Sequence, residues 1–312
     1  MSYYFAYLVA LISLSQASVI IRWSQENPLI LGGWRLLFAS LILRFFFELS
    51  SKLHFTKNVQ LKNASNVKKI KLTRNQIQNI LIIGFVFFVH LFSYAFAAHS
   101  IPVNYLMLIY SCNPVFTAIA NMIMFKEPIK FKHCIAFVFS FLGIYVLVRG
   151  VPSGFSIINK DSNSISIIGV GSAVLAALTF SIYSIFSKKV RKELPNSLVT
   201  SLFYGVASCC FFISILSIGL TPIPMELNKG WVAIFLLALF PTILGHSVFT
   251  YCMNHIDIQI LSIGKLIEPI FAAISAYFIL GEPITFSHFI AFLLISIGIG
   301  ALFINKKAKL SK

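Results

Sequence analysis

Charged residues are scarce in this chain of 312 residues, because only 11% are Asp, Glu, Lys or Arg and only 9 of these are acidic. Soluble domains carry about a quarter charged residues and about half apolar ones, whereas 58% of this chain is hydrophobic. A single soluble core would leave large apolar patches in water. The composition therefore excludes a water-soluble enzyme, a secreted disulfide scaffold and a disordered chain, and it indicates an integral membrane protein.

Several chemical motifs are missing as well. The five cysteines are odd in number, lie in apolar runs and lack metal-ligand spacing, so we expect small buried hydrophobic residues and no disulfide or metal site: Cys112, Cys134, Cys209, Cys210 and Cys252. There is no G-x-x-x-x-G-K-[ST] loop for ATP and no H-E-x-x-H pair for zinc. We predict a protein that is not an enzyme and has no cofactor.

Long unbroken apolar runs are what the sequence does contain, and they argue against a β-barrel, which would show alternation. A spanning helix needs about 20 apolar residues. Hydropathy predicts ten such spans: Tyr3 to Ile21, Leu29 to Phe47, Ile77 to Ala97, Val103 to Phe125, Phe131 to Val148, Ile165 to Phe186, Ser197 to Ile218, Trp231 to Cys252, Ile258 to Leu280 and Phe286 to Ile304. The first run is longer than a signal-peptide core and has no preceding basic residue, so we expect an uncleaved span.

The Lys and Arg residues predict the orientation. Of the 25, 19 fall on segments that are inner if the N-terminus is cytoplasmic, 4 fall on outer segments (Arg22, Arg149, Lys160 and Lys229), and Arg35 and Lys265 lie within spans. This asymmetry predicts cytoplasmic termini, including a basic tail at 306–312, in the inner (plasma) membrane. The net charge of +16 then reflects topology and attraction to anionic lipid, not a nucleic-acid partner.

An internal repeat organises the chain. Between 114 and 147, 15 of 34 positions are identical to the residue 155 positions later, including the matching Glu127-Pro128 and Glu282-Pro283. We predict two five-helix repeats, at 1–150 and 165–305. Because five is odd, the second repeat enters the membrane inverted, which is the architecture of alternating-access carriers.

Three segments carry a likeness to a known family: GGWRLLFASLIL around Arg35, SCNPVFTAIANMIMFKEPI in the fourth span and KLIEPIFAAISAYFILGEPI in the ninth. They resemble the drug/metabolite transporter superfamily, in particular its EamA-type members. The resemblance covers nearly the whole chain and implies a ten-span inverted-repeat carrier of a small metabolite. It supplies no substrate, since the superfamily moves amino acids, nucleotide sugars, organophosphates, cations and drugs. The resemblance is also compatible with a homodimer.

Three ionised groups are predicted at membrane depth: Arg35, Lys265 and Glu268, with Glu268 about 15 Å from the inner face. A charge at mid-bilayer costs about 2.5 to 3.5 kcal/mol, so each should face the interior and find a partner. Two cations face one anion, which invites a substrate carboxylate or phosphate. The repeat equivalents of Lys265 and Glu268 are Tyr110 and Asn113, so the shared fold does not demand these charges. A structural ion pair is the alternative.

Other polar groups within spans are candidates either for cavity lining or for interhelical hydrogen bonds: His90, His246, Gln16 and Asn113. Trp34 stands beside Arg35 and is a candidate border of the site. The symmetric Glu127 and Glu282 are interpreted as helix N-caps, because each precedes a proline that suits the start of the next helix. We interpret His133 and His288 as interfacial packing residues.

These features favour a secondary transporter that moves a small metabolite by alternating access. An amino-acid-like solute or another solute with an anionic group fits the excess of buried cations, and protons are candidate coupling ions through Glu268 or a histidine. The alternatives are a carrier of cationic drug-like compounds, an integral-membrane enzyme such as a lipid transferase or protease, a channel, and a structural scaffold.

Overall fold

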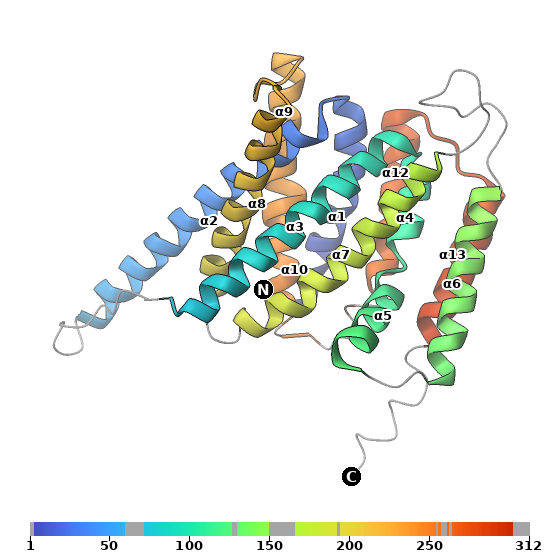
Figure 1. Ribbon diagram of the computed structural model, residues 1–312, viewed down its shortest axis with the longest axis horizontal. Coiled ribbons are helices and arrows are strands. Elements are labelled where there is room, and N and C mark those ends of the chain that lie inside the picture. The colour runs from blue at the N-terminus through green and yellow to red at the C-terminus, as the bar shows by residue number, and fades with distance from the viewer. Residues whose placement is uncertain are drawn as a thin grey trace, which may run out of the picture.

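The computed structural model describes residues 3–59, 72–126, 130–149, 166–191, 194–253, 255–256, 261 and 264–301. Every regular element in these ranges is a helix (Figure 1). They are α1 (Tyr3–Ser24), α2 (Pro28–Val59), α3 (Arg74–Ser100), α4 (Val103–Tyr110), α5 (Asn113–Phe125), α6 (Phe131–Arg149), α7 (Ile167–Arg191), α8 (Asn196–Ser217), α9 (Leu227–Leu237), η1 (Ala238–Ser247), α10 (Val248–Cys252), η2 (Lys265–Ile267), α12 (Glu268–Leu280) and α13 (Phe286–Ala301).

The helices are long and apolar enough for a multi-pass membrane protein. Within the described residues, 7 helical stretches can cross a bilayer by length and composition, and α6 and α13 add two shorter apolar helices. With the interrupted segment that ends in α12, the arrangement is consistent with the ten predicted spans. The prediction of an all-helical membrane fold is confirmed.

The helices pack in a pattern that relates the two parts of the chain. α2 packs against α8, α6 against α13, α3 against α7, and α1 against η1. In Figure 1, α6 and α13 lie side by side at one edge of the molecule and α2 lies towards the opposite edge. In the predicted repeat, the first span corresponds to the sixth, the second to the seventh, and so on. The pairs α2–α8 and α6–α13 then each join two corresponding spans, and the pair α3–α7 corresponds to the pair α1–η1. The packing thus supports two equivalent halves, and the boundaries 1–150 and 165–305 stay a prediction.

Two predicted spans are interrupted, where the sequence had suggested continuous helices. The fourth breaks at Ser111 and Cys112, between α4 and α5. The ninth passes through the short 3-10 helix η2 before α12 begins. Both α5 and α12 carry a proline at their second residue, Pro114 and Pro269, which lacks a backbone N–H and suits a helix start. The interruptions stand 155 residues apart, as the repeat requires.

The eighth predicted span contains a wide helical segment. η1 is a π-helix that includes Pro241. The Thr242 hydroxyl donates to the Leu237 carbonyl at 2.7 Å, and the Ser247 hydroxyl donates to the Thr242 carbonyl at 3.1 Å, each five residues back. Pro241, four residues after Leu237, has no N–H to bond to the Leu237 carbonyl, and the Thr242 hydroxyl donates to this carbonyl.

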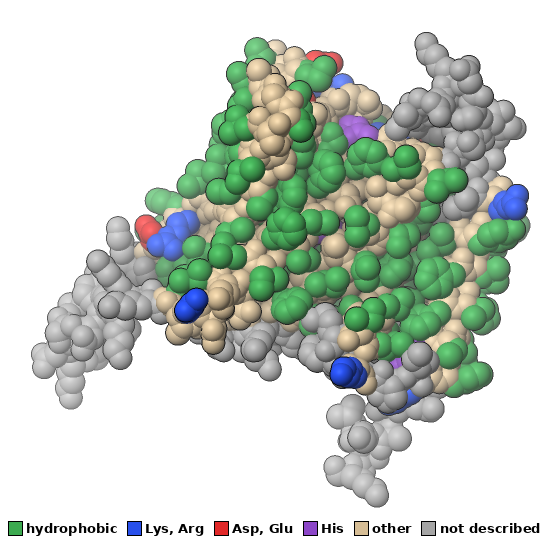
Figure 2. Space-filling model, viewed as in Figure 1, with side chains coloured by type: hydrophobic (Ala, Val, Ile, Leu, Met, Phe, Trp, Pro, Cys, Tyr) green, Lys and Arg blue, Asp and Glu red, His purple; other side chains and the backbone are tan. Residues whose placement is uncertain are grey.

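The outer surface is apolar. On the face shown in Figure 2, hydrophobic side chains cover the middle and charged side chains lie around the rim. Large exposed side chains such as Phe278, Phe131 and Ile167 lie on α12, α6 and α7. Such a surface suits lipid tails rather than water.

Two glycines let α6 and α13 approach closely. A Cβ atom at Gly298 would lie 2.7 Å from the Ser140 hydroxyl and 2.9 Å from the Ala136 carbonyl oxygen. Gly143, its repeat equivalent, would meet Ile295 at 2.8 Å. Small residues at such crossings allow backbones to touch, which is how membrane helices commonly associate.

We predict that Gly298→Val lowers the melting temperature of the purified protein, because the added methyl groups overpack this crossing and cost about 1–3 kcal/mol. Gly300→Val is the matched control, since Gly300 is on the same helix and a Cβ there meets nothing within 4 Å. Equal melting temperatures for the two variants would contradict the close crossing.

Candidate functional site

A buried cavity lies between helices from both halves of the chain. The space between its lining atoms is about 330 Å³ when the part open to the surroundings is counted, and it is lined by Leu14, Ala17, Arg35, His90, Leu91, Tyr94, Tyr110, His246, Lys265 and Glu268. These residues come from α1, α2, α3, α4, η1, η2 and α12. One wall is apolar, formed by α1 and Leu91, and the others carry aromatic and charged groups.

The two interrupted spans meet at this cavity. Tyr110 is the last residue of α4, Lys265 opens η2, and Glu268 is the first residue of α12. The dipole of α12 favours a carboxylate at that position. Both interruptions therefore contribute side chains to the cavity lining.

Lys265 and Glu268 form a buried ion pair in which Nζ and Oε1 are 3.6 Å apart. This separation is too long for a hydrogen bond, and neither atom has a hydrogen-bond partner among the described residues. The ammonium instead lies over the ring of Phe180, at 3.9 Å from its centroid, and near the rings of Phe249 at 4.9 Å and Tyr110 at 5.3 Å. We call these three rings the aromatic cage.

Arg35 enters the same cavity from α2 and is 3% exposed. Its Nε has no hydrogen-bond partner, and in the described part of the chain no acidic side chain pairs with its guanidinium. It therefore does not pair with Glu268. Because the lining holds two cations and one carboxylate, the cavity keeps one uncompensated positive charge.

Two histidines complete the polar wall. The Nδ1 atom of His90 lies 2.8 Å from the Ala176 carbonyl oxygen, which fixes Nδ1 as the protonated donor and ties α3 to α7. His246 lies on η1, with its ring 6.0 Å from that of His90. The widened helix thus brings His246 against the aromatic core.

Six of the nine residues predicted for the site line the cavity: Arg35, Lys265, Glu268, Tyr110, His90 and His246. Three do not. Gln16 donates to the neighbouring Ser15 hydroxyl, Asn113 is buried at the start of α5, and Trp34 donates to the Pro222 carbonyl at 2.6 Å. Consecutive helical residues point about 100° apart, so Arg35 faces the cavity while Trp34 packs against Trp231.

Two rings of the aromatic cage carry no signal in the sequence. Phe180 and Phe249 lie in α7 and α10, among 32 phenylalanines that composition assigns to packing and lipid contact. Only the fold brings them to the Lys265 ammonium.

A second buried ion pair joins the two halves at the end of the bundle where α1 terminates. The Nε of Arg22 is 3.1 Å from Oε1 of Glu282, and both side chains are less than a tenth exposed. Arg22 also donates to the carbonyl oxygens of Ala98 and Ile101. This pair therefore ties α1 and the α3–α4 junction to the α12–α13 loop.

Glu282 corrects one prediction. It does not cap its own following helix, α13; its carboxylate accepts the backbone N–H groups of Val103 and Asn104 at the start of α4, at 3.1 and 3.4 Å. Arg22, counted as an outer loop cation, is a buried residue of the last turn of α1. The sequence pattern could not reveal the Arg22–Glu282 pair, because the two residues are 260 positions apart in the chain. The equivalent Glu127 lies outside the described residues.

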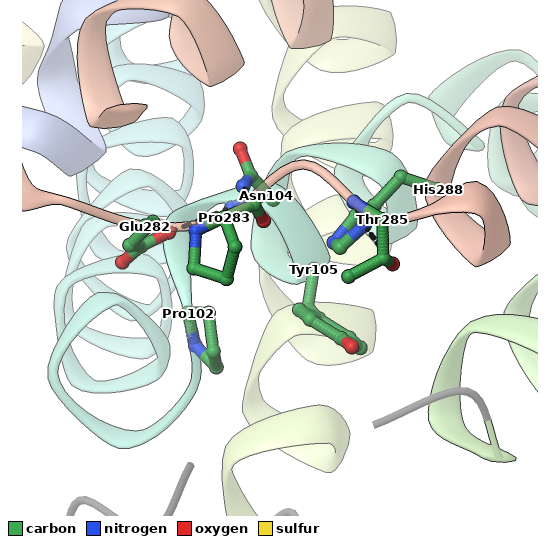
Figure 3. Close-up of a pocket in the computed structure, with 7 residues that line it drawn as sticks. All are labelled: Pro102, Asn104, Tyr105, Glu282, Pro283, Thr285 and His288. Atoms are coloured by element: carbon green, nitrogen blue, oxygen red, sulfur yellow. Dashed lines mark hydrogen bonds between the residues drawn. The ribbon is translucent and has the colours of Figure 1, made fainter. Parts of the chain in front are cut away.

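A smaller pocket, with about 260 Å³ between its lining atoms when the part open to the surroundings is counted, adjoins this pair (Figure 3). Figure 3 shows His288 beside Thr285, with Tyr105 below them and Glu282 on the other side of Pro283. The backbone N–H of Thr285 donates to Nδ1 of His288 at 3.0 Å, so Nε2 carries the proton and has no partner among the described residues. His133 takes the same role for Lys130 N at 3.2 Å, as its repeat position implies.

A helical bundle with an apolar exterior and a charged interior cavity defines a multi-pass membrane protein. The chain belongs to the EamA-like transporter family, whose sequence pattern matches residues 1–149 and 167–304. The predicted family resemblance is thereby confirmed.

Curated relatives are transporters of unstated substrate. An uncharacterized transporter of Clostridium kluyveri is 26% identical over 74% of both chains. Another, from Methanothermobacter thermautotrophicus, is 23% identical over 92% of this chain and 81% of its own. A crystal structure of another protein, at 14% identity, matches 99% of both chains with a TM-score of 0.63, which shows a shared fold.

We predict that Arg22→Met destabilises the protein strongly, because it leaves the Glu282 carboxylate buried without its cation, a change that costs about 3–5 kcal/mol in buried pairs. Thermal unfolding of the purified protein measures the loss. Arg44→Met is the matched control, since the Arg44–Glu48 pair at 2.8 Å is about half exposed and such pairs contribute about 0–1 kcal/mol. A loss no larger than that of the control would contradict a role for Arg22 in holding the halves together.

Proposed function

We propose that this protein is a secondary transporter that moves a small solute with an anionic group across the inner (plasma) membrane by alternating access. The two predicted halves, at 1–150 and 165–305, rock against each other around the central cavity. Both termini face the cytoplasm in this proposal, as the Lys and Arg distribution predicts.

The observation that carries the proposal is the unpaired guanidinium of Arg35. A buried cation without an anionic partner is unfavourable in a low-dielectric interior. A carboxylate or phosphate entering the cavity would receive charge-assisted hydrogen bonds from Arg35, often in a bidentate geometry. The apolar wall of Leu14, Ala17 and Leu91 would contact the body of the solute.

Alternating access requires contacts that close one end and break when it opens. The Arg22–Glu282 pair suits this role, because it is buried, joins the two predicted halves and lies at one end of the bundle. Glu268 is a candidate site for a coupled proton, since it is the carboxylate that lines the cavity.

The alternatives have weaker support. A carrier of cationic drug-like compounds would bring a second positive charge to a cavity that already holds an excess of one. An enzyme with a paired-carboxylate mechanism needs a second acid, and the cavity lining in the described residues contains Glu268 alone.

The test begins with thermal-shift measurements on the purified protein against amino acids, nucleotides, organic phosphates and cationic drugs. A ligand at 100 times its Kd stabilises the folded state by about 2.7 kcal/mol. We expect the hits to carry an anionic group and to lose their effect in Arg35→Met. Saturable counterflow of the hit in proteoliposomes then separates a carrier from a channel or an enzyme.

Gln16→Met is the control for loss of a polar group in the membrane, because Gln16 does not line the cavity. It should bind the hit as the native protein does. Hits confined to cations, or an anion that binds Arg35→Met as tightly as the native protein, would refute the proposal.

A further inference from the structure

The Lys265 ammonium occupies a ready-made site for an organic cation. Three rings from three separate elements surround it: Tyr110 of α4, Phe180 of α7 and Phe249 of α10. The rings also support one another, with the Phe180 centroid 5.6 Å from that of Tyr110 and 6.3 Å from that of Phe249. Such cages recognise ammonium groups through the negative faces of the rings.

The fourth side of this site is acidic. The Glu268 carboxylate lies 3.6 Å from Nζ without a hydrogen bond, and Lys265 is only 6% exposed. Ring faces plus a nearby carboxylate are the two features that bind a desolvated ammonium. The site is thus filled by a side chain of the protein itself.

We propose that Lys265 is the specificity-determining residue of the cavity, and that its tethered ammonium fills the cation cage and so excludes amines and other organic cations. The inference rests on the proposed function. It narrows the solute class to organic acids or phosphate esters that lack an ammonium group. The anionic group meets Arg35, and the cage, the one cation site that the described part of the cavity lining forms, is already filled by Lys265.

We expect the Lys265→Ala variant to bind a small organic cation in the emptied cage. The atoms removed, from Cγ to Nζ, correspond to propylammonium, so this ion should enter the vacated cage. Propylammonium should raise the melting temperature of Lys265→Ala and bind it at least about tenfold more tightly than it binds the native protein, a factor that desolvated cation–π contacts can supply. The neutral 1-propanol, of the same size, should have no such effect.

Two further variants make the test specific. Lys265→Met keeps the cage filled with a neutral chain and should not bind propylammonium. Adding Phe180→Leu to Lys265→Ala removes the nearest ring and should weaken propylammonium binding several-fold, whereas Phe278→Leu on the exposed surface of α12 should leave it unchanged.

The amount of folded Lys265→Ala that accumulates in cells is a further measurement. If Lys265→Ala accumulates only in cells grown with propylammonium, and not with 1-propanol, the rescue supports the cage. Failure to accumulate with or without the ion, absence of binding by the folded variant, or equal binding by the native protein would each overturn the proposal. These measurements need no transport, so the two proposals can fail separately. Counterflow can be absent although propylammonium binds the cage, and counterflow can be present although propylammonium does not bind.

Discussion

Burying charge in an apolar helical bundle is the constraint on which this structure depends. A charged group in lipid or in a dry interior must find an opposite charge, a dipole or aromatic faces. Glu282 meets Arg22 and the start of α4, whereas Lys265 meets Glu268 and three rings. Arg35 has no such partner among the described residues. The charges therefore divide into those that hold helices together and one, Arg35, that we propose binds the anionic group of the solute.

The same constraint explains why the helices are interrupted where they are. Lys265 opens the 3-10 turn η2 and Glu268 begins α12, so the two charges lie three residues apart at this interruption and both line the cavity. The first half has an equivalent helix interruption, from Ser111 to Pro114, but it carries Tyr110 at the position that corresponds to Lys265. At this equivalent position the first predicted repeat supplies the Tyr110 ring and the second supplies Lys265 and Glu268, while the third charge of the cavity, Arg35, comes from the first repeat.

Sequence patterns predicted the features that follow from composition and local chemistry. Hydropathy, the 155-residue offset and the family motifs gave the membrane class, the helical fold and six residues of the cavity lining. They did not predict the contacts that depend on packing between distant parts of the chain. Trp34 turns away from Arg35 because neighbouring helical residues point in different directions. Phe180 and Phe249 carry no local signal, and the partner of Glu282 lies 260 residues away, at the end of α1.

In the proposed transport cycle, the cavity opens to each side of the membrane in turn. Ala17 lines it from α1 and is almost fully buried. In a variant without the five native cysteines, Ala17→Cys can be exposed in proteoliposomes to a membrane-impermeant anionic thiol reagent on one side at a time. The account predicts reaction from both sides, slowed by an anion that Arg35 binds. Reaction from one side only, or from neither, would contradict it.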